Sequence, residues 1–231
     1  MDNKPFGQVE GGFATAMLAL WPLARQALAP IDLKSKKGII VSGHSKGAAM
    51  SFLAASLLKS AHPTILVQDC CFAPPLTCDR TFRGKYNALG LRPFTVRLQN
   101  EYDLVPFLPY VLVLDALASA ERRSRPDRRN RLVTADLRAR QIENDYVAVG
   151  ILRYITTTCA IEHGEKAEYD AFTAIVTALL ELQFVEIAEA HSAQAATSPA
   201  CASRPVPMDG RRLGRSGGTR TPNPRFWRPV L

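Results

Sequence analysis

The sequence lacks an apolar run that could cross a membrane, and its cysteines lack the spacing of a metal site. No stretch of about 18 consecutive apolar residues occurs, and the N-terminal MDNKPFGQVEGGF does not place an apolar segment behind a charged one, as a signal peptide would. The five cysteines form an odd set without a CxxC pair: Cys70, Cys71, Cys78, Cys159 and Cys201. We therefore expect a cytoplasmic chain with no transmembrane segment, metal, cofactor or disulfide framework, in which most cysteines are buried thiols.

No internal repeat is present, and the length fits one domain followed by a tail. A chain of 231 residues with 47% hydrophobic residues can bury a substantial core. We expect residues 1–191 to form this domain. From residue 192 the hydrophobic periodicity disappears and Pro, Gly, Ser, Thr and Arg dominate. Such a composition cannot offset the entropy of ordering, so residues 192–231 are predicted to be a disordered tail.

The net charge of +8 is concentrated in two segments. Residues 201–231 contain seven arginines and one aspartate, and residues 121–140 contain eight arginines and three acidic residues. Basic residues in loops and tails are most often a solvated surface, so no nucleic-acid partner is expected. Binding of nucleic acid through residues 121–140 remains the weaker alternative, and the sequence leaves the oligomeric state open.

Short apolar runs alternate with helical patterns along the chain. Strands are predicted at residues 39–41, 64–68 and 94–98, and DYVAVGILRYITT predicts a further strand or a hairpin that turns at Gly150. Helices are predicted at residues 11–28, with Pro22 as a kink or break, at 48–58, and at 169–190 as one long helix. This alternation indicates an α/β fold, a mostly parallel sheet flanked by helices.

Ser45 lies in the pattern Gly43-His44-Ser45-Lys46-Gly47, between an apolar strand and an alanine-rich helix. G-x-S-x-G in this frame is typical of a nucleophile elbow, a sharp strand-to-helix turn at which crowding favours glycine at both flanking positions. The start of the helix would place the Lys46 backbone amide and the positive end of the helix dipole beneath an oxyanion. The alternative is a glycine and serine turn without chemistry.

A nucleophilic serine needs a base and an orienting carboxylate, which follow it in the order Ser, acid, His in α/β-hydrolases. Asp103 comes directly after the strand at 94–98, at the sheet edge where catalytic groups collect. It ranks before Asp69 and Asp79, although an aspartate at a strand end can also simply cap a turn.

Of the four histidines, two are poor candidates for the base. His44 is expected to point away from its neighbour Ser45, and His62 lies at the far end of the following helix. His163 lies in a polar turn between a strand and the terminal helix, so it can reach the top of the sheet. We prefer it to His191, which is expected to be solvated at the end of that helix.

Several stretches, in order, resemble the class 3 lipase family, the fungal-lipase-like branch of the α/β-hydrolases, over roughly Val9–Leu180. These stretches are VEGGFATAMLALWP, the elbow VSGHSKGAAMSFLAA, CFAPP, the acid loop RLQNEYDLVPFLP, DYVAVG and EHGEKAEYDAF. The resemblance implies Ser45 as nucleophile, Asp103 as acid and His163 as base. It also implies a carboxylic ester hydrolase, a lipase or esterase, that acts on acyl esters or lipids through an acyl-enzyme.

The chain differs from the family pattern at its beginning. The family has an earlier strand and an F-R-G-T loop that supplies a second oxyanion donor, and this chain begins after that position. We therefore expect an N-terminally truncated relative with an incomplete sheet. The alternative function is an inactive lipase-like fragment or an interaction protein that lacks a complete oxyanion hole. Four apolar residues are candidates either for an acyl pocket or for ordinary packing: Phe72, Phe107, Leu108 and Tyr110.

Overall fold

The structure is a computed structural model that describes residues 7–124 and 146–192. Most of the arginine-rich segment 121–140, and all of the predicted disordered tail except Ser192, lie outside the described residues.

Helices and strands alternate along the chain, as the sequence predicts. The elements are, in order, α1 (Gly11–Leu28), the 3₁₀ helix η2 (Leu33–Ser35), β1 (Ile39–His44), α2 (Lys46–Ala61), β2 (Val67–Phe72), α3 (Arg80–Ala88), η3 (Arg92–Phe94), β3 (Thr95–Asn100), η4 (Val105–Phe107), α4 (Val111–Ser124), β4 (Ile151–Ile155), β5 (Ile161–Glu162), α6 (Glu165–Leu180) and α7 (Phe184–Ala190).

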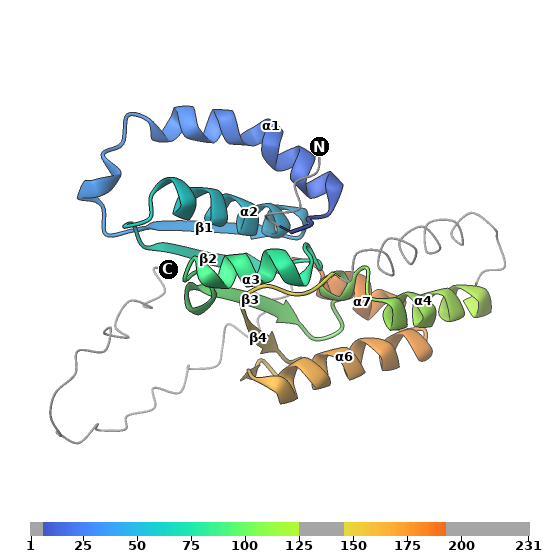
Figure 1. The fold of residues 1–231 in the computed structure, drawn as a ribbon. Coiled ribbons are helices and arrows are strands. Elements are labelled where there is room, and N and C mark those ends of the chain that lie inside the picture. The colour runs from blue at the N-terminus through green and yellow to red at the C-terminus, as the bar shows by residue number, and fades with distance from the viewer. Residues whose placement is uncertain (1–6, 125–145, 193–231) are drawn as a thin grey trace, which may run out of the picture.

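The five strands of the described residues form one sheet in the order β1-β2-β3-β4-β5. Figure 1 shows the first four of them. The first four strands are parallel to their neighbours, and only β5 runs antiparallel, against β4. The carboxyl ends of β1 to β4 therefore lie at the same edge of the sheet. The predicted fold class, a mostly parallel sheet flanked by helices, is confirmed.

The buried side chains of the strands lie mainly on one face of the sheet. Three helices contact this face through side chains: Ser51 of α2 with Cys71 of β2, Tyr86 of α3 with Thr95 of β3, and Glu168 of α6 with Arg97 of β3. The parallel registers align Asp69 with Thr95 and Cys71 with Arg97, so these strand side chains share one face. On the other face the strand side chains are half-buried or exposed, and Ile40 is 70% exposed.

Two strand predictions need correction. The strand expected at 64–68 runs instead from Val67 to Phe72, because it pairs residue by residue with β1 from Ile39 to His44. The predicted turn at Gly150 precedes β4, and the hairpin that joins β4 to β5 turns at residues 156–160.

Two helix predictions also differ from the structure. α1 continues through Pro22, so a break at this proline, one of the two predicted effects, is wrong. The long terminal helix is divided into α6 and α7, because Leu182 adopts a left-handed conformation with a φ of 63°. The Leu182 N–H donates to Leu179 and the Gln183 N–H donates to Ala178, which is the Schellman pattern that ends a helix.

The cysteines follow the prediction in part. Cys71 and Cys78 are buried free thiols and Cys70 is a half-buried one. Cys159 differs from them because it takes part in a disulfide bond. Within the described ranges, no helix combines the length and the apolarity that crossing a bilayer requires.

Asp69 of β2 is a carboxyl group inside the core, with 1% of its surface exposed. Among the described residues, neither of its oxygens has a hydrogen-bond partner. Burial raises the pKa of Asp69 to about 6, an effect that the nearby Cys71 and Ser51 offset only in part. A raised pKa means that the folded protein holds this proton more tightly than the unfolded chain does. The contribution of the protonated Asp69 carboxyl to the free energy of unfolding is complete below about pH 4, and it is lost as the pH rises through about 6.

We predict that Asp69→Asn increases the free energy of unfolding at pH 8 by about 1–3 kcal/mol, because the amide carries no charge to desolvate. At pH 4 the variant and the parent should differ little. Urea denaturation at both pH values measures this difference. Asp32→Asn, which changes an exposed aspartate, is the control and should leave the pH dependence unchanged. Equal stability changes at pH 4 and pH 8 would contradict the prediction.

Candidate active site

Ser45 occupies the sharp turn between β1 and α2. Its backbone has a φ of 56° and a ψ of −123°, a conformation that residues with a side chain rarely adopt. The Ser45 N–H donates to the Phe72 carbonyl at 2.9 Å, and the Ser45 carbonyl accepts from the Ala48 N–H at 2.9 Å. One hydrogen bond to β2 and one from the first turn of α2 thus hold the strained turn, as a nucleophile elbow requires.

The two glycines of the elbow have different roles. A Cβ atom at Gly43 would overlap the backbone of Gly47 and lie 2.7 Å from the Ala48 nitrogen, so only glycine allows strand and helix to approach this closely. At Gly47 the same atom would meet nothing within 4 Å. The predicted crowding therefore holds at Gly43 and is wrong at Gly47.

Asp103 lies just beyond the carboxyl end of β3. The turn is formed by Tyr102, which has a φ of 66°, and the Val105 N–H donates to Asp103 Oδ1 at 3.0 Å. The Asp103 side chain is completely buried. Burial raises the pKa of Asp103 to about 6, although the charge of His191 and the Val105 N–H both act to lower it.

His191 connects Ser45 with Asp103. Its Nδ1 lies 3.0 Å from Asp103 Oδ1, and its Nε2 lies 3.0 Å from Ser45 Oγ. An acceptor-only carboxylate fixes the tautomer: Nδ1–H donates to Asp103, which leaves Nε2 to accept from the serine hydroxyl. The expectation that His191 is solvated is wrong, since only 28% of its side chain is exposed.

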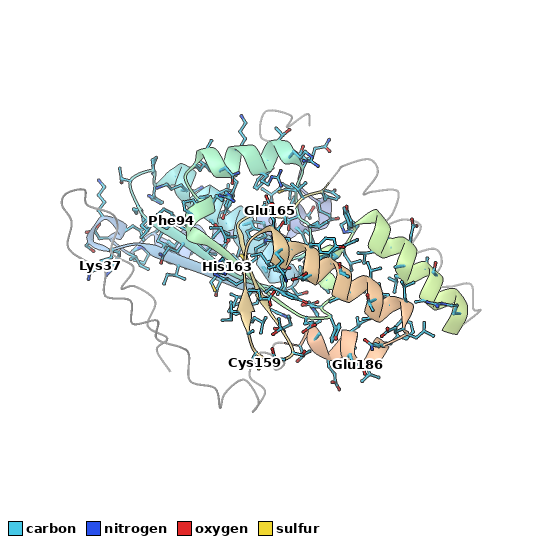
Figure 2. All side chains as sticks on the ribbon, turned by 90° about the horizontal axis from the view of Figure 1, so that it is seen from below. Lys37, Phe94, Cys159, His163, Glu165 and Glu186 are labelled. Atoms are coloured by element: carbon cyan, nitrogen blue, oxygen red, sulfur yellow. The ribbon has the colours of Figure 1, made fainter. Side chains whose placement is uncertain are left out.

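His163, the predicted base, lies elsewhere. It follows β5, and β5 runs antiparallel to β4, so the chain returns toward the amino ends of the strands. Gly164, the next residue, borders a cavity together with Gly150 and Ile151, where β4 begins. Figure 2 shows His163 at the start of α6, and its side chain is exposed. The prediction that His163 meets Ser45 and Asp103 is therefore contradicted by the direction of β5.

Two side chains at the carboxyl edge of the sheet hold the chain around His191. Asn100, the last residue of β3, donates from Nδ2 to the Ala190 carbonyl at 2.9 Å. His44, the last residue of β1, donates from Nε2 to the His191 carbonyl at 2.9 Å. The His44 and His191 rings also lie 4.9 Å apart between centroids. His44 points toward the site rather than away from it, and neither residue was identified as functional from the sequence.

The rival acids and the remaining histidine are not part of this site. Asp69 is buried within β2 and aligned with Thr95 at the start of β3. Asp79 caps α3 by accepting from the Phe82 N–H at 2.7 Å. His62 lies at the end of α2, in a cavity beside α1. In the part of the chain that the structure describes, no group of three or more acidic, histidine or cysteine side chains is arranged to hold a metal ion.

A mostly apolar cavity of about 330 Å³ opens at Ser45. Besides Ser45 and Lys46, its walls include six apolar residues: Phe13, Pro75, Leu76, Val105, Leu108 and Pro109. Of the four apolar candidates, only Leu108 lines this cavity, while Phe107 and Tyr110 line a neighbouring one. Lys46 is the first residue of α2, so its N–H has no acceptor within the helix and is available at the cavity.

The fold and this arrangement define a protein of the α/β-hydrolase type. A mostly parallel sheet carries a serine at a strained turn between a strand and a helix, and an aspartate and a histidine follow in that order. More specifically, residues 1–113, just under half of the chain, match the model of the family Lipase (class 3). This part of the chain is therefore similar to the class 3 lipases.

Solved structures, lipases among them, resemble this chain at low sequence identity. Lipase II from Rhizopus niveus is 19% identical, with a TM-score of 0.50, over 76% of this chain and 60% of that chain. A mutant form of MDLA from Penicillium cyclopium is 21% identical, with a TM-score of 0.50, over 79% and 56%. A lipase from Rhizopus microsporus var. chinensis is 19% identical, with a TM-score of 0.46, over 67% and 45%. The chain thus spans about half the length of these proteins. No curated protein matched the chain.

The hydrogen bond from His44 leads to a prediction about the reactivity of Ser45. In His44→Ala the His191 carbonyl loses its donor, so the imidazole is held less firmly. We predict that a fluorophosphonate then modifies Ser45 about 5–30 times more slowly, which corresponds to the loss of one hydrogen bond. His44→Gln can still donate and should be affected less. His62→Ala is the control, and an unchanged rate in His44→Ala would contradict the assigned role.

Proposed function

We propose that the protein is a serine hydrolase that cleaves carboxylic esters, with Ser45 as nucleophile, His191 as general base and Asp103 as orienting acid. The observation that carries this proposal is the continuous hydrogen-bonded path from Ser45 Oγ through His191 to Asp103, with 3.0 Å at each end. His191 thereby replaces His163 in the triad implied by the family resemblance.

In the first half of the reaction, Ser45 Oγ attacks the ester carbonyl carbon while His191 Nε2 takes the hydroxyl proton. The carbonyl oxygen becomes an oxyanion, which the Lys46 N–H and the amino end of α2 stabilise. The oxyanion then collapses, the bond to the alcohol breaks, and His191 returns the proton to the leaving alcohol. An acyl group remains bonded to Ser45.

In the second half, water takes the place of the alcohol. His191 removes a proton from the water as it attacks the acyl carbon, and the proton then returns to Ser45 Oγ as the carboxylic acid leaves. Asp103 keeps its negative charge in both halves, since it orients the imidazole and stabilises its protonated form. Because burial raises the pKa of Asp103 to about 6, the site needs a pH above this value.

An acyl ester with an apolar chain is the substrate class that the site favours. The walls beside Ser45 are mostly apolar, and 330 Å³ lies at the small end of ligand pockets, which favours a short or medium acyl chain. The match of residues 1–113 to the class 3 lipase model supports a lipid ester. An inactive chain that serves as an interaction protein is the alternative, and it requires that Ser45 be unreactive.

We predict that Ser45→Ala and His191→Ala each lower kcat for p-nitrophenyl butyrate at pH 8 by about 10³-fold or more, because both belong to one proton-transfer unit. His163→Ala should change kcat by less than about twofold, as expected for an exposed residue away from the site. The rate at which p-nitrophenolate is released gives kcat for all three variants. A large loss in His163→Ala with an active His191→Ala would overturn the assignment, and hydrolysis that persists in Ser45→Ala would overturn the proposed function.

A further inference from the structure

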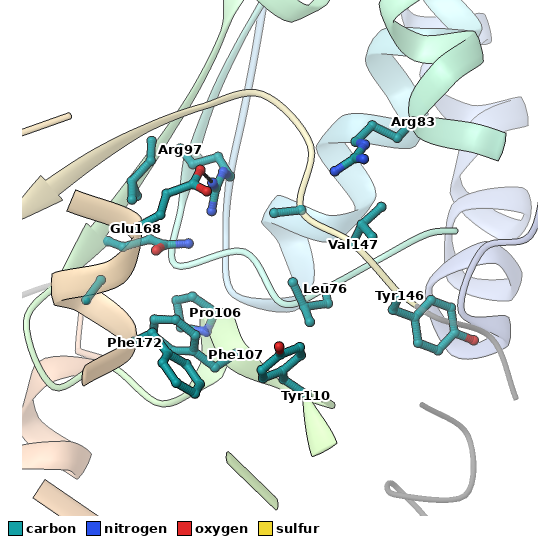
Figure 3. Close-up of a pocket in the computed structure, with 14 residues that line it drawn as sticks. Leu76, Arg83, Arg97, Pro106, Phe107, Tyr110, Tyr146, Val147, Glu168 and Phe172 are labelled. Carbon is teal, nitrogen blue, oxygen red and sulfur yellow. Dashed lines mark hydrogen bonds and ion pairs between the residues drawn. The ribbon is translucent and has the colours of Figure 1, made fainter. Parts of the chain in front are cut away.

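A second cavity, of about 320 Å³, lies next to the one at Ser45. Figure 3 shows its two kinds of wall: aromatic side chains gather around Phe172, and charged side chains lie opposite them. Phe107 and Tyr110 pack edge to face against Phe172, with ring centroids 6.2 and 5.6 Å away. One part of the cavity is therefore suited to a hydrocarbon chain.

Arg97 forms the charged wall, and its position is unusual for an arginine. It lies within β3 on the core face of the sheet and is only 6% exposed. Its Nη2 donates to Glu168 Oε1 at 2.8 Å, but its buried Nε has no hydrogen-bond partner among the described residues. A guanidinium group has five N–H donors, so Arg97 has more donors than its carboxylate partner uses.

Arg83 of α3 adds a second positive charge to the same cavity. It is half-buried, and no hydrogen bond or ion pair joins its guanidinium to another described side chain. In Figure 3 its guanidinium faces the cavity from the side opposite Arg97. Two arginines against the single carboxylate of Glu168 leave this part of the cavity with a net positive charge, which attracts an anion.

The two cavities are neighbours. Leu76 and Tyr146 line both the cavity at Ser45 and the cavity at Arg97. The cavity at Ser45 and the charged cavity therefore adjoin each other through these two side chains.

We propose that this second cavity binds a carboxylate with a short or medium apolar chain, whose head is held by Arg97 and Arg83 and whose chain lies along Phe107 and Phe172. Such an acid is the product class of the proposed ester hydrolysis, so the choice of ligand rests on that function. Glu168 keeps its bond to Arg97 and weakens the binding by repulsion. The cavity thus holds the acid product away from Ser45.

Binding of octanoate, compared with 1-octanol, tests this proposal by titration calorimetry. Neither compound is an ester, so the result is independent of turnover, and failure of hydrolysis and failure of binding can be told apart. The intact protein should bind octanoate at least about tenfold more tightly than 1-octanol, as expected for charge-assisted hydrogen bonds. The Nε–H resonance of Arg97 in an NMR spectrum should shift with octanoate and stay in place with 1-octanol.

Substitutions of the charged residues should change octanoate affinity in opposite directions. Arg97→Gln and Arg83→Gln should each weaken binding about tenfold, and Glu168→Gln should strengthen it severalfold. Arg153→Gln is the matched control, since Arg153 lies on the adjacent strand with its side chain on the other face of the sheet. If Arg97→Gln does not fold, the variants Arg83→Gln and Glu168→Gln and the Nε–H resonance of Arg97 still test the proposal. Equal binding of octanoate and octanol, or no effect of Arg83→Gln and Glu168→Gln, would overturn the proposal.

Discussion

Parallel pairing of the strands is the constraint on which the site depends. Because β1, β2 and β3 run in the same direction, the residues that follow β1 and β3 reach the same edge of the sheet. This places Ser45 and Asp103 on either side of a position that a histidine can fill. α7 then brings His191 to this position, and two side chains at the strand ends, Asn100 and His44, hold the carbonyls of its last turn. The site is therefore a product of strand direction together with these two hydrogen bonds.

Several features of the core lower stability, and only some of them serve the site. Ser45 keeps a strained backbone, which costs on the order of 1–3 kcal/mol, and this strain presents the serine that we propose as nucleophile. Asp103 is buried so that its charge acts strongly on His191. Asp69 is buried in the same way, but it lies within β2 beside Cys71 and Tyr86, away from the reacting groups. The exposed Ile40 shows in addition that one face of the sheet has little cover within the described residues.

The sequence was sufficient to place Ser45 and Asp103, because both follow strands whose apolar patterns are local and whose direction follows from the fold class. It was not sufficient to place the histidine. That choice depends on the antiparallel direction of β5, which is only two residues long, and on a helix end at Leu182, where neither glycine nor proline marks a break. The same applies to β2, whose boundaries are set by pairing with β1 rather than by its own apolar run. A histidine directly after a helical segment, as His191 is, is the available signal, but the polar composition that follows it indicates exposure, which the structure does not show.

The central claim is that Ser45, His191 and Asp103 form one hydrogen-bonded unit. A proton NMR spectrum tests it most directly, since an Nδ1–H that donates to a buried carboxylate gives a resonance far downfield of the amide region. The account predicts that this resonance is present in the parent protein and in His163→Gln, and that it is lost in His191→Gln and in Asp103→Ala. A resonance that disappears in His163→Gln and survives in His191→Gln would contradict it.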